Sequence, residues 1–289
     1  MISLLLAILF SSVIFVIFKL FDRFGIDTFQ AIVFNYFMAL ACGLIFYGHE
    51  WKPIALEQQE WLIFAVLAAF LFISLFVIMG ISSQKNGVAI TSVAVKMSMA
   101  ASVFGMIFLY NEKVSALKIV GIALAFAGVV MVSWQGKSEE KSNNKSWWML
   151  LVLFAGSGIL DLVLNYTQGT FSKIISNSLF SAVGFGLAGI IGLIILGIQI
   201  AQGKARFEAK NLLAGFILGI PNFFSIFLLM KAYGDTGWSD STVLAVINVS
   251  IVSISAFLGL IAFKEKISLL KGIGIISSLL AIFVLYAAN

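Results

Sequence analysis

The sequence predicts an all-α integral membrane protein with ten transmembrane helices, arranged as two five-helix repeats of inverted topology. Composition is the first observation: 61% of the 289 residues are hydrophobic and 11% are charged, against about 25% charged in ordinary globular domains. A soluble protein of this size could not cover its surface with so few charged side chains. The second observation is a series of ten long apolar segments, and the third is a hairpin sequence that occurs twice.

Each apolar segment has about the 20 residues that a helix needs to cross the hydrocarbon core of a bilayer. Strands of a membrane barrel would instead give shorter segments of alternating polarity. The first segment has no basic residue before it and no small-residue cleavage site after it, so we expect a retained helix and no signal peptide. The predicted spans are 3–21, 29–47, 61–82, 88–110, 115–134, 147–168, 176–200, 211–232, 240–263 and 267–286.

The repeated hairpin sequence defines the two halves. Its turn, Glu112-Lys113-Val114-Ser115, returns 153 residues later as Glu265-Lys266-Ile267-Ser268. Because each half contains five predicted helices, an odd number, the second half must enter the membrane in the opposite sense, as in many secondary transporters. The expected organisation is a first repeat over 1–134, a polar linker over 135–146 and a second repeat over 147–289.

Lys96 is a cation near the middle of the fourth predicted span. A lysine at the centre of a membrane helix costs roughly 2.5–3.5 kcal/mol on insertion scales, so it should face protein or a water-filled cavity. Two interpretations stay open: a structural ion pair or bond to helix carbonyls, and a cation that lines a transport path.

Asp161 is the natural partner of Lys96, because it is the only acid well inside a predicted span. Asn165 and Gln168 follow at positions that share its helix face, together with Gly158. A polar stripe on a membrane helix faces protein or water rather than lipid. We therefore expect Asp161 and Asn165 to line a cavity, whereas Gln168 lies close enough to the helix end to be interfacial.

Two further asparagines lie deep in predicted spans. Asn222 directly follows Pro221, where a kink and a freed carbonyl are expected, so it either binds a solute or satisfies the disturbed helix. Asn248 shares a helix face with Ser255 and Gly259, and for it cavity lining and interhelical hydrogen bonding remain equally open. The predicted substrate-binding residues are Lys96, Asp161, Asn165, Asn222 and Asn248.

The two turn glutamates, Glu112 and Glu265, have a simpler explanation. Each stands just before a helix, where the helix dipole favours an acid, and Ser115 and Ser268 can cap the same helices. We therefore interpret both acids as part of a capped hairpin with no part in chemistry.

Catalytic and metal-binding motifs are missing from the sequence. It contains no H-E-x-x-H and no C-x-x-C, and it has one histidine and one cysteine. We expect no enzyme, no catalytic residues, no metal and no cofactor. The favoured function is a secondary transporter of a small metabolite by alternating access. The alternative is an intramembrane enzyme or lipid-handling protein that uses Lys96 and Asp161 as an acid–base pair.

The hairpin residues also resemble those of a known family. Glu112, Ser115 and Gly121, and again Glu265, Ser268 and Gly274, resemble the EamA-like ten-helix branch of the drug/metabolite transporter superfamily. The resemblance implies a multi-pass protein of the bacterial inner membrane that moves an amino acid, amine, sugar or related zwitterionic or anionic solute without ATP. It also implies a coupling proton or an exchanged solute, and a monomer or homodimer. The composition itself predicts contact with the lipid bilayer and, because the basic residues form no block, no nucleic-acid partner.

The orientation of the chain stays open. Lysine and arginine are more frequent in the connections on the side of the 135–146 linker than in the alternate connections, which favours a cytoplasmic linker by the positive-inside rule. The resemblance implies the reverse, with both termini in the cytoplasm.

Overall fold

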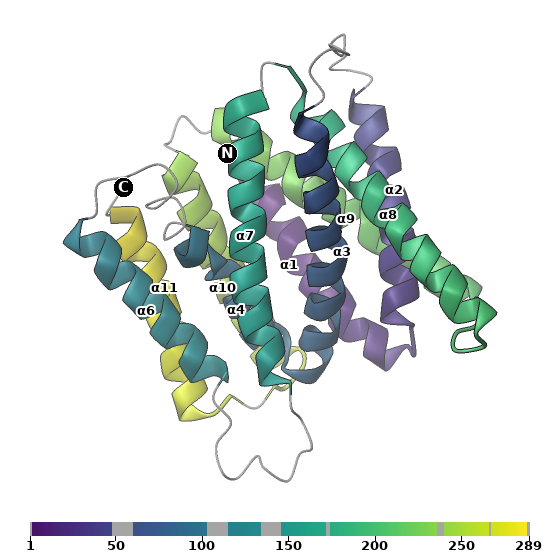
Figure 1. The fold of residues 1–289 in the computed structure, drawn as a ribbon. Helices are drawn as coiled ribbons and strands as arrows, with labels where there is room; N and C mark the ends of the chain where they lie inside the picture. Colours follow the sequence, from purple (N-terminus) through teal and green to yellow (C-terminus); the bar gives the residue numbers. More distant parts are fainter. Residues whose placement is uncertain are drawn as a thin grey trace.

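Ten helices make up the described part of the chain, in which no strand occurs (Figure 1). The computed structural model describes residues 2–47, 60–102, 115–133, 146–171, 174–235, 240–265 and 267–287. The helices, labelled as in Figure 1, are α1 (Ile2–Arg23), α2 (Thr28–Tyr47), α3 (Trp61–Lys85), α4 (Val88–Lys96), α6 (Ala116–Ser133), α7 (Trp147–Phe171), α8 (Asn177–Ala201), α9 (Ala209–Asp235), α10 (Asp240–Ile261) and α11 (Leu269–Ala287). Apart from the end of α4, their bounds agree with the predicted spans to within a few residues.

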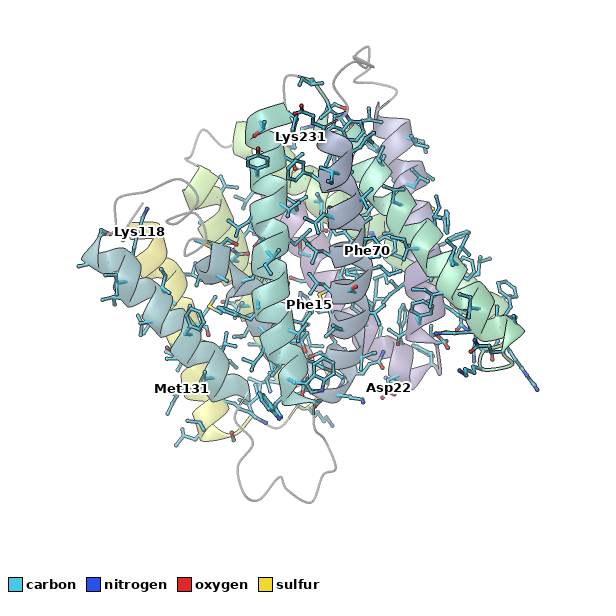
Figure 2. The ribbon with its side chains drawn as sticks, viewed as in Figure 1. Phe15, Asp22, Phe70, Lys118, Met131 and Lys231 are labelled. Carbon is cyan, nitrogen blue, oxygen red and sulfur yellow. The ribbon has the colours of Figure 1, made fainter. Side chains whose placement is uncertain are left out.

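The helices have the length and surface of membrane spans. Six of them, α1, α2, α3, α7, α8 and α9, are long and apolar enough to cross a bilayer, and four shorter apolar helices accompany them within the described ranges. Large apolar side chains such as Ile194, Leu213 and Phe257 are exposed on the outside of the bundle, as Figure 2 shows for the labelled Phe70. Lipid tails are as apolar as these side chains, so contact between them carries no free-energy penalty. The chain is a multi-pass all-α membrane protein, as predicted.

Helix pairing defines two edges of the bundle and the helices that connect them. Helices α6 and α11 pack side by side at one edge, and α2 packs against α8 and α9 at the opposite edge (Figure 1). Between these edges, α4 packs against α10 and α7, and α1 packs against α9 and α10. The helices that carry the candidate residues, α4, α7, α9 and α10, are therefore linked to one another through α1 and α4.

Two glycines in α9 allow it to approach α2 closely. A Cβ atom added at Gly219 would lie 2.6 Å from the carbonyl oxygen of Asn35, and one added at Gly215 would lie 3.0 Å from the Asn35 nitrogen. This is the small-xxx-small pattern by which membrane helices bring their backbones together. It fixes α9, and with it Asn222, against α2.

We call the end of the bundle that carries the connections 24–27, 86–87, 202–208 and 262–268 the linker face. Hydrogen bonds join these connections: Asn211 Oδ1 accepts from the Asp27 nitrogen at 3.0 Å, and Gln30 Nε2 donates to the Arg206 carbonyl at 2.8 Å. Figure 2 shows Asp22 at this end and Lys118 and Lys231 at the other. Both marked chain ends lie at the opposite face (Figure 1).

Candidate solute-binding site

Helix α4 is interrupted at its most polar point. Its regular part ends at Lys96, Met97 forms a turn, and helix resumes over residues 98–102. The Ala100 nitrogen donates to the Met97 carbonyl at 2.9 Å, three residues back, so this turn is tighter than an α-helical turn. The predicted span over 88–110 is therefore interrupted at Met97, and residues 103–110 lie outside the described part. Interrupted helices of this kind form the binding sites of many transporters.

Asp161 on α7 lies against the resumed part of α4. Its Oδ2 accepts hydrogen bonds from the Ser98 hydroxyl at 3.1 Å and from the Ser102 hydroxyl at 3.3 Å. Lys96 lies at the interruption, half-buried, and its positive charge interacts electrostatically with the Asp161 carboxylate. The structure thus brings together the two charges that the sequence singled out, and adds two serines that are not among the predicted substrate-binding residues.

Gly158 is the reason that α7 can approach α4 so closely. A Cβ atom at this position would lie 2.6 Å from the Ala101 Cβ and 3.2 Å from the Ser98 carbonyl oxygen. The Ser102 hydroxyl also lies 3.3 Å from the Gly158 carbonyl. Because Asp161 follows Gly158 by about one helical turn, this contact sets the height at which its carboxylate meets the two serines.

The surroundings of this charge pair are only partly protein. The Asp161 side chain is exposed in the isolated chain, whereas Ser98 and Ser102 are buried. A carboxylate on lipid is costly, and intramembrane charges nearly always face a bundle interior or water. The arrangement can therefore present a carboxylate with bound hydroxyls and a nearby ammonium to a solute that enters from water.

Asn248 on α10 makes an interhelical contact with α4. It is 5% exposed, and its Nδ2 donates to the Met99 Sδ at 3.5 Å. Of the two interpretations left open by the sequence, this contact supports interhelical hydrogen bonding. A thioether is a weak acceptor, so the amide is only lightly held in the fold. Met99 lies three residues after Lys96, which brings Asn248 close to the interrupted part of α4.

Asn222 on α9 is buried without a partner for its donor. The side chain is 5% exposed, and its Nδ2 has no hydrogen-bond partner among the described residues. Helix α9 continues on both sides of Pro221. Ser12 on α1 is likewise buried with a free hydroxyl, at the same height as Asn222 because Phe10 stacks on Phe224 at 5.4 Å. No sequence argument singled out Ser12, since a lone serine in an apolar helix is usually a packing residue.

For two of the remaining candidates the structure describes the backbone but not the side chain. Asn165 and Gln168 lie on α7, four and seven residues after Asp161, and their side chains fall outside the described part. Gly259, which shares a helix face with Asn248, borders the Glu265 carboxylate. Within the described ranges, no group of three or more histidine, cysteine, aspartate or glutamate side chains could hold a metal ion.

The hairpin residues are only partly as predicted. The Ser268 hydroxyl accepts from the Lys271 nitrogen at 3.4 Å and the Ser115 hydroxyl accepts from the Lys118 nitrogen at 3.2 Å, so both serines cap the helices that follow them. The interpretation of Glu265 was wrong, because its carboxylate caps the start of α4 instead of its own hairpin. No local sequence pattern predicts this distant partner, and Glu112 lies outside the described residues.

Comparisons with known proteins agree with this architecture. An uncharacterized protein of Haemophilus influenzae is 28% identical over 293 residues, covering 98% of this chain and 97% of its own length. A crystal structure with 14% sequence identity superimposes with a TM-score of 0.58 over 96% of both chains, and this likeness shows the fold alone. The model of the EamA-like transporter family matches residues 1–134. The resemblance stated from the hairpin residues is thus confirmed, and the family match covers the first 134 of the 289 residues.

Proposed function

We propose that the chain is a secondary transporter that moves a small metabolite by alternating access around the interrupted part of α4. The EamA-like family comprises transporters of small molecules rather than enzymes, and the chain is a multi-pass membrane protein. The observation that carries the proposal is the Lys96 and Asp161 pair, held with Ser98 and Ser102 where α4 is interrupted. Such costly charges inside a membrane mark transport pathways by default.

The proposed mechanism needs two halves, and the helix contacts support such an organisation. We propose a first repeat over 1–134, a linker over 135–146 and a second repeat over 147–289. A twofold axis between inverted repeats would pack corresponding helices on each other, and α6 packs on α11, α4 on α10 and α2 on α8. The Ser277 hydroxyl also donates to the Leu124 carbonyl at 3.1 Å across 153 positions, the offset of the repeated hairpin.

The charges indicate the kind of solute. Lys96 offers an ammonium to a carboxylate or phosphate, and Asp161 with its two serines offers a carboxylate to an amine. An amino acid, amine, sugar or related zwitterionic or anionic solute fits this pair, with Asn165, Asn222 and Asn248 as further lining residues. A buried amide with an unpaired donor, as at Asn222, gains a hydrogen bond when a solute supplies the acceptor. We also propose that the protein lies in the bacterial inner membrane and that it couples transport to a proton or to a counter-transported solute.

Reconstituted transport tests this function directly. The purified protein would first be screened by thermal shift against a metabolite panel, and the stabilising compounds would then be tested for uptake into proteoliposomes. We expect Lys96→Met to abolish both the stabilisation and the uptake while the protein still elutes as a folded species. Full uptake by the folded Lys96→Met protein would overturn the proposed role of this site.

A further inference from the structure

Glu265 reaches from the α10–α11 connection into the other half of the chain. Its Oε1 accepts a hydrogen bond from the Val88 nitrogen at 2.8 Å, and its Oε2 lies 3.4 Å from the Ala89 nitrogen as a second acceptor. These are the first two residues of α4. Backbone donors at a helix start have no partner within the helix, and the helix dipole favours an anion there. The carboxylate therefore satisfies the start of the helix that carries Lys96.

Two glycines make room for this carboxylate. A Cβ atom added at Gly87 would lie 2.6 Å from Glu265 Oε2, and one added at Gly259 would lie 2.5 Å from the same oxygen. Gly87 also has a φ of +95°, a conformation that side-chain-bearing residues rarely adopt. The backbone on both sides of the carboxylate is thus shaped to receive it.

Lys19 extends the contact to two more helices. Its Nζ lies 3.9 Å from Glu265 Oε1 and donates to the Gln84 carbonyl at the end of α3 at 3.0 Å. Gln84 Nε2 in turn donates to Thr28 Oγ1 at 2.7 Å and to the Phe18 carbonyl at 3.2 Å. The Glu265 and Lys19 side chains are only 12% and 23% exposed. One connected set of polar contacts therefore joins α1, α2, α3, α4 and the α10–α11 connection at the linker face.

We propose that Glu265 is an inter-half latch, which holds the start of α4 against the α10–α11 connection and closes the linker-face end of the transport path. Lys19 is its second component. When α4 moves in the transport cycle, the bonds from Glu265 to Val88 and Ala89 must break, and the linker face opens. Glu265 is thus a positioning residue that acts through α4 on Lys96. This inference rests on the proposed function, since closure has meaning only for a path that opens.

The test measures accessibility and needs no solute, so its failure would leave the transport proposal standing. In a Cys42→Ala background, Ser92→Cys places a thiol on α4 in a position that is fully buried. Its rate of labelling by a membrane-impermeant maleimide would be measured in vesicles of both orientations. Glu265→Ala should raise this rate by about tenfold, the effect on an equilibrium of losing one good hydrogen bond to a charged group.

Two controls separate opening from general loosening. Glu208→Gln removes an exposed acid from the same face, paired with Lys210 at 2.9 Å, and should leave the rate unchanged. A Ser181→Cys reporter near the opposite end of the bundle should not gain reactivity in Glu265→Ala. If Glu265→Ala is not folded, the isosteric Glu265→Gln decides the question. Labelling of Ser92→Cys at the parent rate in the folded variant, or an equal rise at Ser181→Cys, would overturn the latch.

Discussion

The Ser98 hydroxyl donates a hydrogen bond to the Asp161 carboxylate at 3.1 Å, and this bond joins the interrupted part of α4 to the middle of α7. Ser98 also lies two residues after Lys96, so one short segment of α4 provides both a cation and a hydroxyl around the same acid. Gly158 sets the distance between the helices, because no larger residue would fit against Ala101. Four predictions follow from this geometry and from the packing around it.

Neutralising both charges distinguishes a functional pair from a structural one. Asp161→Asn alone leaves the Lys96 ammonium without its nearby acid, so we expect a lower melting temperature and a loss of uptake. The double variant Lys96→Met/Asp161→Asn contains neither charge and should recover stability, because no charge is then left without an opposite charge nearby. Uptake should remain lost. Recovered uptake in the double variant would assign the pair to folding alone.

The two serines should affect solute binding more than folding. Ser98→Ala and Ser102→Ala each remove one hydrogen bond to the Asp161 carboxylate. A hydrogen bond to a charged group contributes roughly 1.5–3 kcal/mol, and most of that is recovered if water replaces the hydroxyl. We expect each variant to raise the apparent Kd of a stabilising compound several-fold in the thermal-shift assay. An unchanged Kd in both variants would show that the two serines do not contribute to solute binding.

Asn222→Ala should separate binding from stability. Because the Asn222 Nδ2 has no partner among the described residues, its removal costs the fold no donor hydrogen bond, and the melting temperature should change little. The KM for uptake should rise, since the solute loses a donor. Asn211→Ala is the contrasting variant: its side chain accepts from the Asp27 nitrogen and donates to Gln30. It should lower the melting temperature with little effect on KM.

Gly219→Val should disrupt the packing of α9 on α2. The added side chain would overlap the Asn35 backbone, where a Cβ atom alone already lies 2.6 Å from the carbonyl oxygen. Overpacking of this kind typically costs about 1–3 kcal/mol. Gly197→Val is the matched control, because nothing lies within 4 Å of a Cβ atom there. Thermal unfolding in detergent should show a clearly lower melting temperature for Gly219→Val than for Gly197→Val. Equal melting temperatures of the two variants would contradict the close contact between α9 and α2.

The sequence alone determined the fold class and the helix positions. Ten apolar segments and few charges require membrane helices, because lipid cannot satisfy unpaired backbone groups. The two charges of the site were also visible, since Lys96 and Asp161 are conspicuous in apolar surroundings. The capping role of Ser268 followed from its place just before α11, because capping depends on neighbours in the chain.

Only the tertiary structure decided which residues meet. The partner of Glu265 lies 177 positions away at Val88, and the sequence around the acid fits a local cap equally well. The same holds for Ser98 and Ser102, whose spacing is compatible with packing or with binding a carboxylate, and for the free donor of Asn222. The physical reason is that local patterns report the preferences of neighbouring residues, whereas a hydrogen bond between helices depends on their relative height and rotation. Those are set by close contacts such as Gly158 on Ala101.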